Sequence, residues 1–310
     1  EKKTAYQDCY ASLNAGKTLG IGNYDSANII HSNGKFYLLV GTSTSNRDHF
    51  YIVDAKTLYY ENSAVVGANL SGLTILNEQY GLVTGDGIRR IDLKSLNNVR
   101  IKNERLLCFY NSIIYNGKVL SNDTYKDESK VKYYDVNELI AAKEGEAPAV
   151  TELDIIQKQK INFVLAKDGN VYTLESADNG CNIVKIKNDF TLEKVFANFQ
   201  PAKGPYHSSP TIGMVASETE NIIYLVSTDG AIYKYILGDS DSLKAPFIAA
   251  ESGVSITAPL QLNQQSGELY VTYTEERKDE SKIVVYSKDG KVLHTVDCGE
   301  SVPSQILFNN

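Results

Sequence analysis

Short runs in which apolar residues alternate with polar ones, or stand together, recur along the whole chain and predict β-strands. The second strands of the expected repeat units are 35–41, 79–85, 117–122, 169–175, 222–228 and 268–273. Third strands follow at 49–54, 88–92, 131–135, 182–186, 231–235 and 282–286. First strands are expected at 27–31, 72–76, 106–115, 160–166, 211–216 and 256–262. Four short strands with their turns fill a unit of about 40–55 residues, which is the size of one propeller blade.

One phrase repeats within these units. Residues 51–58 (YIVDAKTL) recur as 89–96 (RRIDLKSL) and as 132–139 (KYYDVNEL). Each copy is a strand-like run followed by Asp, two variable residues, a polar residue and Leu, and a period of about 40 residues is typical of repeated small sheets. The three aspartates, Asp54, Asp92 and Asp135, are expected to cap turns through side-chain-to-backbone hydrogen bonds rather than to act in catalysis.

The turn residues agree with this pattern. Asn-Gly or Asp-Gly pairs precede strand-like runs at 33–34, 86–87, 116–117, 168–169, 179–180, 229–230 and 289–290. Both residue types tolerate the positive φ that a type I′ hairpin turn requires. Segment 136–143 is an exception, because it is expected to form two helical turns before Pro148.

Two fragments remain once six complete units are assigned. Residues 304–308 resemble a first strand, and residues 5–11 and 17–22 resemble third and fourth strands. Joining them would make a seventh blade from both chain ends, which would also remove an exposed sheet edge. The sequence therefore favours an all-β, seven-bladed β-propeller with a jointly closed last blade, a six-bladed propeller being the alternative. Since composition does not change along the chain, residues 1–310 are expected to form a single domain.

Charge and cysteine content narrow the function classes. The net charge of −7 argues against a general nucleic-acid or anionic-membrane binder, because those proteins need a cationic surface. The cluster Arg89, Arg90 and Lys94 is expected to be a solvated strand face. The cysteines, at 9, 108, 181 and 298, lack metal-ligand spacing, and a Cys9–Cys298 bridge stays open. No apolar run is long enough to span a bilayer, and the start at Glu1 is typical of a mature or trimmed chain.

The repeats resemble the β-propellers called YVTN-type or quinoprotein-amine-dehydrogenase-like. The residues that carry the resemblance are 269–273 (LYVTY), 223–227 (IYLVS) and the Asp-x-x-Thr/Ser-Leu copies. The whole chain, with its ending 303–308 (PSQILF), also resembles exported envelope propellers of Bacteroidetes-type bacteria, many of which are lipoproteins. The resemblance implies an extracytoplasmic location, in the periplasm or at the outer-membrane surface, and a binding role. A lipid anchor upstream of Glu1 stays open. Since Trp is absent, the Trp-bearing docking repeats of quinone-cofactor propellers are missing.

Loops from each fourth strand to the next first strand are expected to surround the mouth of a central channel, where a ligand would bind. Segment 204–210 combines Tyr, His and two Ser residues within a Gly/Pro frame. Tyr supplies an apolar face with a polar tip, and His supplies a switchable donor. The predicted ligand-binding residues are Asn23, Tyr24, Arg105, Lys160, Tyr206, His207 and Ser208. The alternative is that these loops only connect the blades.

The leading functional prediction is a non-enzymatic binding propeller of the cell envelope. It would hold a glycan, a nutrient small molecule or a partner protein, and it is expected to be a monomer without a cofactor. No catalytic residue is assigned. A lactonase- or lyase-like hydrolytic enzyme is an alternative, with His207, Arg105 and Glu300 as its candidates. A structural accessory subunit of an outer-membrane transporter is another. No metal site is predicted, since the acidic loop 123–128 lacks the spacing and glycine of a calcium loop.

Overall fold

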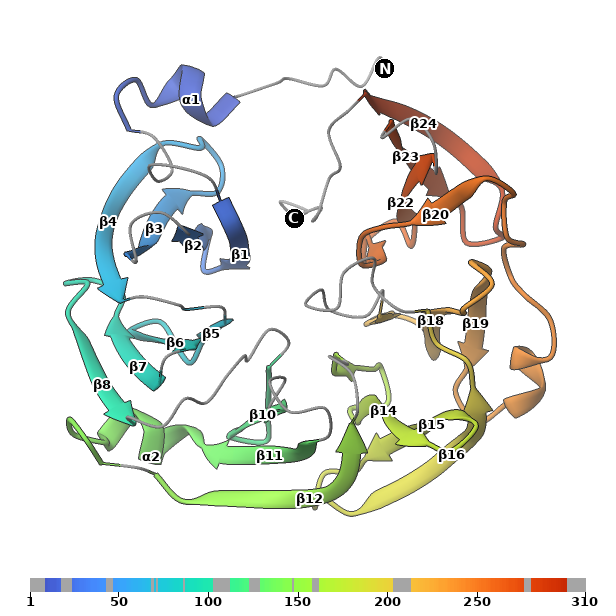
Figure 1. Ribbon diagram of the computed structural model, residues 1–310, viewed down its shortest axis with the longest axis horizontal. Coiled ribbons are helices and arrows are strands. Elements are labelled where there is room, and N and C mark those ends of the chain that lie inside the picture. Colours follow the sequence, from blue (N-terminus) through green and yellow to red (C-terminus); the bar gives the residue numbers. More distant parts are fainter. Residues whose placement is uncertain are drawn as a thin grey trace. The chain divides into compact units, whose positions relative to one another are not determined.

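The computed structural model describes residues 9–17, 24–42, 47–67, 70, 72–85, 87–102, 112–122, 129–146, 148–157, 162–202, 213–275 and 280–299 (Figure 1). The chain divides into two compact units. The first unit contains the described parts of 1–125 and 132–152, and the second contains those of 126–131 and 153–308. In this described part no helix is long and apolar enough to cross a membrane.

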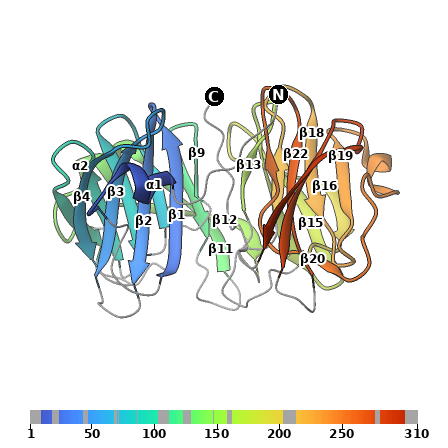
Figure 2. The same cartoon turned by 90° about the horizontal axis from the view of Figure 1, so that it is seen from above.

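The first unit contains two complete antiparallel sheets. The strands of the first sheet are β1 (Tyr24–Ser32), β2 (Lys35–Thr42), β3 (Asp48–Asp54) and β4 (Tyr60–Gly67), paired in that order (Figure 2). Those of the second sheet are β5 (Gly72–Ile75), β6 (Tyr80–Gly85), β7 (Gly87–Asp92) and β8 (Asn98–Lys102), also in chain order. A short helix, α1 (Cys9–Leu13), precedes them.

The third sheet has the order β12-β11-β10-β9, and the boundary between the two units falls within β11 and β12. Its strands are β9 (Ile113–Tyr115), β10 (Lys118–Asn122), β11 (Ser129–Asp135) and β12 (Val150–Gln157). Helix α2 (Val136–Ala141) follows β11, as the sequence predicts. Asp135 caps this helix by accepting hydrogen bonds from the backbone N–H groups of Asn137 and Glu138, which have no partner within the first helical turn.

The second unit contains three further sheets. The fourth consists of β13 (Val164–Leu165), β14 (Val171–Ala177), β15 (Gly180–Ile186) and β16 (Leu192–Phe199). The fifth has three strands, β17 (Met214–Ala216), β18 (Ile222–Val226) and β19 (Ile232–Ile236), followed by the 3₁₀ turn η1 (Ser240–Leu243). In the sixth, β20 (Val254–Ile256), β22 (Leu269–Glu275), β23 (Ser281–Tyr286) and β24 (Val292–Gly299) pair in that order, and β21 (Gln261–Leu262) also pairs with β22.

The prediction of seven blades is wrong: the described residues form six sheets, each built from consecutive parts of the chain. A strand was expected over 5–11, yet α1 begins at Cys9. The reason is that Tyr6, Cys9, Tyr10 and Leu13 follow helical spacing as well as a partial alternation, and such short apolar patterns do not separate helix from strand. The expected C-terminal strand, 304–308, lies outside the described residues. The first sheet contains four strands that all come from residues 24–67.

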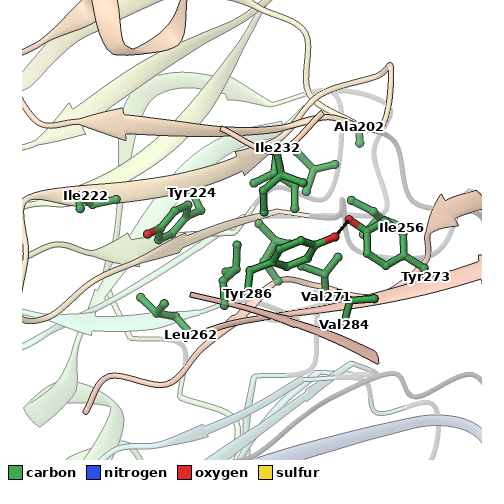
Figure 3. Packing of buried hydrophobic residues seen from close by; sticks show 14 residues of the cluster. Ala202, Ile222, Tyr224, Ile232, Ile256, Leu262, Val271, Tyr273, Val284 and Tyr286 are labelled. Carbon is green, nitrogen blue, oxygen red and sulfur yellow. Dashed lines mark hydrogen bonds between the residues drawn. The ribbon is translucent and has the colours of Figure 1, made fainter. Parts of the chain in front are cut away.

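The apolar cores lie between the faces of successive sheets within each unit. Between the first and second sheets, Leu39 and Phe50 pack with Val83 and Ile91. Alternate residues of β2 point the other way, so Leu38 belongs to a separate cluster on the opposite face. Between the fifth and sixth sheets, Tyr224, Ile232, Val271, Val284 and Tyr286 belong to one cluster (Figure 3). This burial on both faces is what the continuous apolar runs predict.

Five of the seven Asn-Gly and Asp-Gly pairs adopt one of two turn geometries. At Asn33-Gly34 and Asn116-Gly117 both residues have positive φ, as a type I′ turn requires, which confirms the prediction there. At 168–169, 229–230 and 289–290 only the glycine has positive φ. There the glycine N–H donates to the carbonyl three residues earlier, and the turn is one residue longer. This is the geometry of a three-residue hairpin loop, in which a type I turn is followed by one residue, here glycine, in the left-handed conformation.

Capping by the repeated aspartates is confirmed. The Asp92 carboxylate accepts hydrogen bonds from the backbone N–H groups of Lys94 and Ser95 and from the Ser95 hydroxyl, at 3.0, 2.7 and 3.0 Å. Asp54 makes the equivalent bonds with Lys56 and Thr57. These bonds to the ionised form lower the pKa of both carboxyl groups. The aspartates thus hold the chain reversal from the third to the fourth strand.

Candidate functional site

Most of the predicted ligand-binding residues cannot be placed. Asn23, Arg105, Lys160, Tyr206, His207, Ser208 and the alternative catalytic residue Glu300 lie outside the described residues. Tyr24 begins β1, but only its backbone is described. Whether these side chains converge therefore stays a prediction. Among the other histidines, His31 lies 5.2 Å from the Phe36 ring and His49 5.9 Å from the Tyr51 ring, measured between ring centroids, so both contact aromatic neighbours.

The topology of the fourth sheet fixes the end at which the described chain leaves β16. Since all its strands are antiparallel, the β14–β15 turn and the chain leaving β16 lie at one end of the sheet. The β13–β14 and β15–β16 turns lie at the other end, separated by a strand of seven or eight residues, roughly 20–25 Å. The described chain, which continues to residue 202, therefore leaves the sheet at the first of these two ends.

A polar recess of about 420 Å³ lies at the second end. It is lined by Asn170, Lys185, Lys187, Asn188 and Asp189, which come from the β13–β14 turn, the end of β15 and the β15–β16 turn. The volume is within the range of about 300–1,000 Å³ that is typical of small-molecule sites. The recess could not be found from the sequence, because its residues come from two turns that are neighbours only in the folded sheet.

A hydrogen-bonded ion pair orders one side of the recess. The ammonium group of Lys185 lies 2.8 Å from the Asp168 carboxylate, to which the hydroxyl of Tyr172 also donates at 2.8 Å. Burial acts to raise the pKa of Asp168, but the bonds from Lys185, Tyr172 and Asn170 outweigh it and lower the pKa. Burial and the bond to Asp168 raise the pKa of Tyr172. Asp168 is therefore ionised and Tyr172 neutral at neutral pH.

The other side of the recess carries a second ion pair and a carboxylate that can accept further hydrogen bonds. Lys187 lies 2.9 Å from Glu193, a bond that lowers the pKa of Glu193. Asp189 accepts hydrogen bonds from the hydroxyl and the backbone N–H of Thr191, at 2.6 and 3.0 Å, which lower its pKa. Both bonds go to Oδ1, and no other residue in the described part of the chain bonds Oδ2. The recess thus presents ammonium donors, amide groups and a carboxylate oxygen side by side.

The backbone beside the recess is strained at Phe190, which has a φ of +64°. Its N–H donates to the carbonyl of Lys187 at 2.8 Å, the same bond that glycine makes in the turns at 166–170, 227–231 and 287–291. A left-handed backbone costs an L-residue about 1–2 kcal/mol relative to the right-handed one, whereas glycine adopts it freely. Glycine is therefore the residue that stability alone would favour here.

Paired charges also mark the corresponding end of sheets in the first unit, and no pattern in the sequence revealed them. Lys35 is paired in register with Asp54 and contacts Glu61. Lys118 lies 2.6 Å from Asp135. An antiparallel hairpin places the first residue of its first strand opposite the last residue of its second, so the lysine at the start of β2 or β10 faces the aspartate at the end of β3 or β11. Within the described residues no group of three or more His, Cys, Asp or Glu side chains could hold a metal ion.

Comparisons with known proteins support the fold. A β-propeller domain of Cps50 (Swd1) from Myceliophteria thermophila has a TM-score of 0.54 at 12% identity, covering 90% of this chain and 91% of that one. A functionally unknown protein from Desulfotomaculum acetoxidans has a TM-score of 0.56 at 12% identity, covering 93% and 89%. A streptogramin B lyase has a TM-score of 0.51 at 14% identity, covering 89% and 84%. At these identities the likeness shows the fold alone.

No protein of curated function matches the sequence. A family model does, over residues 1–309, and its description is a domain of unknown function (DUF5074). The match covers nearly the whole chain. The solved structures that resemble this chain include a β-propeller domain. The chain therefore belongs to the DUF5074 family and has an all-β propeller fold with six blades.

Proposed function

We propose that this propeller is a non-enzymatic binding protein of the cell envelope, located outside the cytoplasm. Its ligand is a glycan, another nutrient molecule or a partner protein, held by the loops that join one sheet to the next. Segment 204–210 carries the proposal, because Tyr206, His207 and Ser208 combine an aromatic face with switchable and neutral hydrogen-bonding groups. Support comes from the fourth sheet, because the described chain leaves β16 at the end where the β14–β15 turn lies.

Binding to a glycan array and pull-down from envelope extracts test this proposal. Tyr206→Ala should weaken capture of whichever ligand class the wild type binds, by at least tenfold, because a central aromatic anchor supplies much of the contact area. Tyr59→Ala is the matched control, since Tyr59 is an exposed tyrosine in a turn of the first sheet. If no ligand class binds, or if Tyr206→Ala binds as the wild type does, the proposed loop site is wrong.

A hydrolase or lyase is the second candidate. The observation that favours it is that a streptogramin B lyase shares this fold, so the architecture is compatible with catalysis. His207 would act as the acid or base, with Arg105 and Glu300 as its partners. Turnover of a panel of lactones and oligosaccharides, abolished by His207→Ala, would support the enzyme. Absence of turnover, together with tight binding of the same compounds, would support the binding protein.

A further inference from the structure

The recess on the fourth sheet is distinct from the loop site of the proposed function. It lies at the β15–β16 turn, and none of the residues that line it belongs to the proposed loop site. Any ligand of the recess therefore requires a site of its own.

The charges of the recess indicate what it can hold. Two ammonium groups, Lys185 and Lys187, are balanced by Asp168 and Glu193, and Asp189 adds one further carboxylate. The excess is one negative charge, which disfavours phosphate, sulfate or a uronic acid. Each ammonium group has three donors and the ion pairs use only part of them, while Asp189 Oδ2 accepts. Hydroxyl groups of a ligand can both donate and accept hydrogen bonds, so they can bond the ammonium donors as well as the carboxylate acceptor.

Phe190 provides the second observation. Its half-buried side chain follows Asn188 and Asp189 directly, and both of these line the recess. Leu58 and Leu96 have the same left-handed backbone in the turns before β4 and β8, so such a turn keeps a side chain in place of glycine where that side chain makes a contact, and strain of this kind clusters at functional positions. An aromatic ring beside polar groups supplies an apolar surface for a ligand that has both kinds of face.

We propose that this recess is a second binding site, which takes a neutral saccharide unit, with Phe190 and Asp189 as its main contacts. The apolar face of the sugar lies against Phe190, and its hydroxyls donate to Asp189 Oδ2 and accept from Lys185 and Lys187. Because the recess is open and shallow, affinity for one unit is weak, and multivalent display is needed to detect it.

The test uses the full chain on an array of neutral and anionic oligosaccharides, followed by saturation-transfer NMR with the neutral sugars that bind. Asp189→Asn keeps the turn-closing acceptor Oδ1 but removes the charge on Oδ2, and it should reduce binding at least fivefold. Asp289→Asn is the matched control, because Asp289 occupies the same position of the β23–β24 turn and does not line this recess; its binding should equal the wild type. Equal binding by Asp189→Asn and wild type would overturn the proposal.

Phe190→Gly separates a binding role from a structural one. We expect its melting temperature to be unchanged or higher, since the strain is relieved, and its neutral-sugar binding to fall at least fivefold. A large drop in melting temperature would show that Phe190 serves packing, and it would overturn its assigned contact. If Tyr206→Ala removes the neutral-sugar signal and Asp189→Asn does not, the sugar binds the loop site, and the recess proposal fails alone. Binding only of anionic sugars would also overturn it.

Discussion

Arg90 offers the sharpest test of how the first unit is held together. Its Nη1 atom donates hydrogen bonds to the carbonyl of Ile140 and, at 3.0 Å, to the carbonyl of Ala142, at the C-terminal end of α2. The last carbonyls of a helix have no partner within the helix, so this arginine of β7 supplies one from the neighbouring sheet. The expectation that Arg90 belongs to a solvated strand face is wrong, because the side chain is half-buried against the helix.

We expect Arg90→Met to lower the free energy of unfolding of this region by about 2 kcal/mol. Hydrogen bonds to a charged group contribute about 1.5–3 kcal/mol, and a cation at a helix C-terminus about 0.3–1 kcal/mol. The guanidinium also lies 5.3 Å from the Tyr80 ring, a contact of about 0.5–1 kcal/mol at an exposed site. These contributions are not additive, and water can replace part of the bonding at a half-buried position, which places the sum near 2 kcal/mol.

Hydrogen–deuterium exchange of a peptide covering residues 136–143 measures the effect where it arises. A loss of about 2 kcal/mol corresponds to roughly 30-fold faster opening, since about 1.4 kcal/mol is a factor of ten. Lys94→Met is the control, because Lys94 is an exposed cation in the turn after β7. It should leave exchange in α2 unchanged. If Arg90→Met also leaves α2 exchange unchanged, or accelerates exchange equally in every sheet, the proposed capping by Arg90 is wrong.

Three further predictions concern other polar contacts. Asn14→Ala should cost about 2 kcal/mol in urea unfolding, since the backbone N–H of Tyr60, which donates to Asn14 at 2.7 Å, loses its partner. Tyr273→Phe and Tyr286→Phe should each cost about 1 kcal/mol, and the double variant less than their sum, because the hydroxyls lie 3.0 Å apart in an apolar cluster (Figure 3). The folded-state pKa of Asp168 is lowered, so its contribution is present above the unfolded value of about 3.9 and is lost as the pH falls below it. Melting temperatures from pH 3 to 7 should therefore fall at the acid end, and less steeply for Asp168→Asn.

The second and third strands of each sheet could be predicted from the sequence, for a physical reason. In five of the six described sheets they lie in the middle with both faces covered, so their apolar runs are long and bounded by turn residues. The first strands match less well: β1 (24–32) is longer than its predicted range of 27–31, and β5 (72–75) ends one residue before the predicted range of 72–76. The run 256–262 divides into β20 and β21 because Pro259, between them, has no N–H to donate to the neighbouring strand.

Side-chain roles that depend on distant partners could not be predicted. Asn14 bonds the backbone of Leu58 and Tyr60, and Arg90 bonds that of Ile140, contacts between residues about 45–50 positions apart. No local pattern marks such a residue, because its own neighbours in the sequence neither require nor reveal the partner. The recess of the fourth sheet was missed for the same reason. Conversely, the Asp92 turn was predicted because all its bonds lie within three residues.

The outer strands show how a protein made of small sheets limits pairing with other chains. The pairings β3–β4, β7–β8, β15–β16 and β23–β24 all contain a register shift, and a bulge at an outer strand disrupts the row of free backbone groups. In β24 the exposed Val292 shares a face with Tyr286, whereas the exposed Val296 shares the opposite face with Ile283. The bulge between these two valines thus divides the apolar edge between two faces. An incoming strand would bury only part of it, and this favours the expectation that the chain is a monomer.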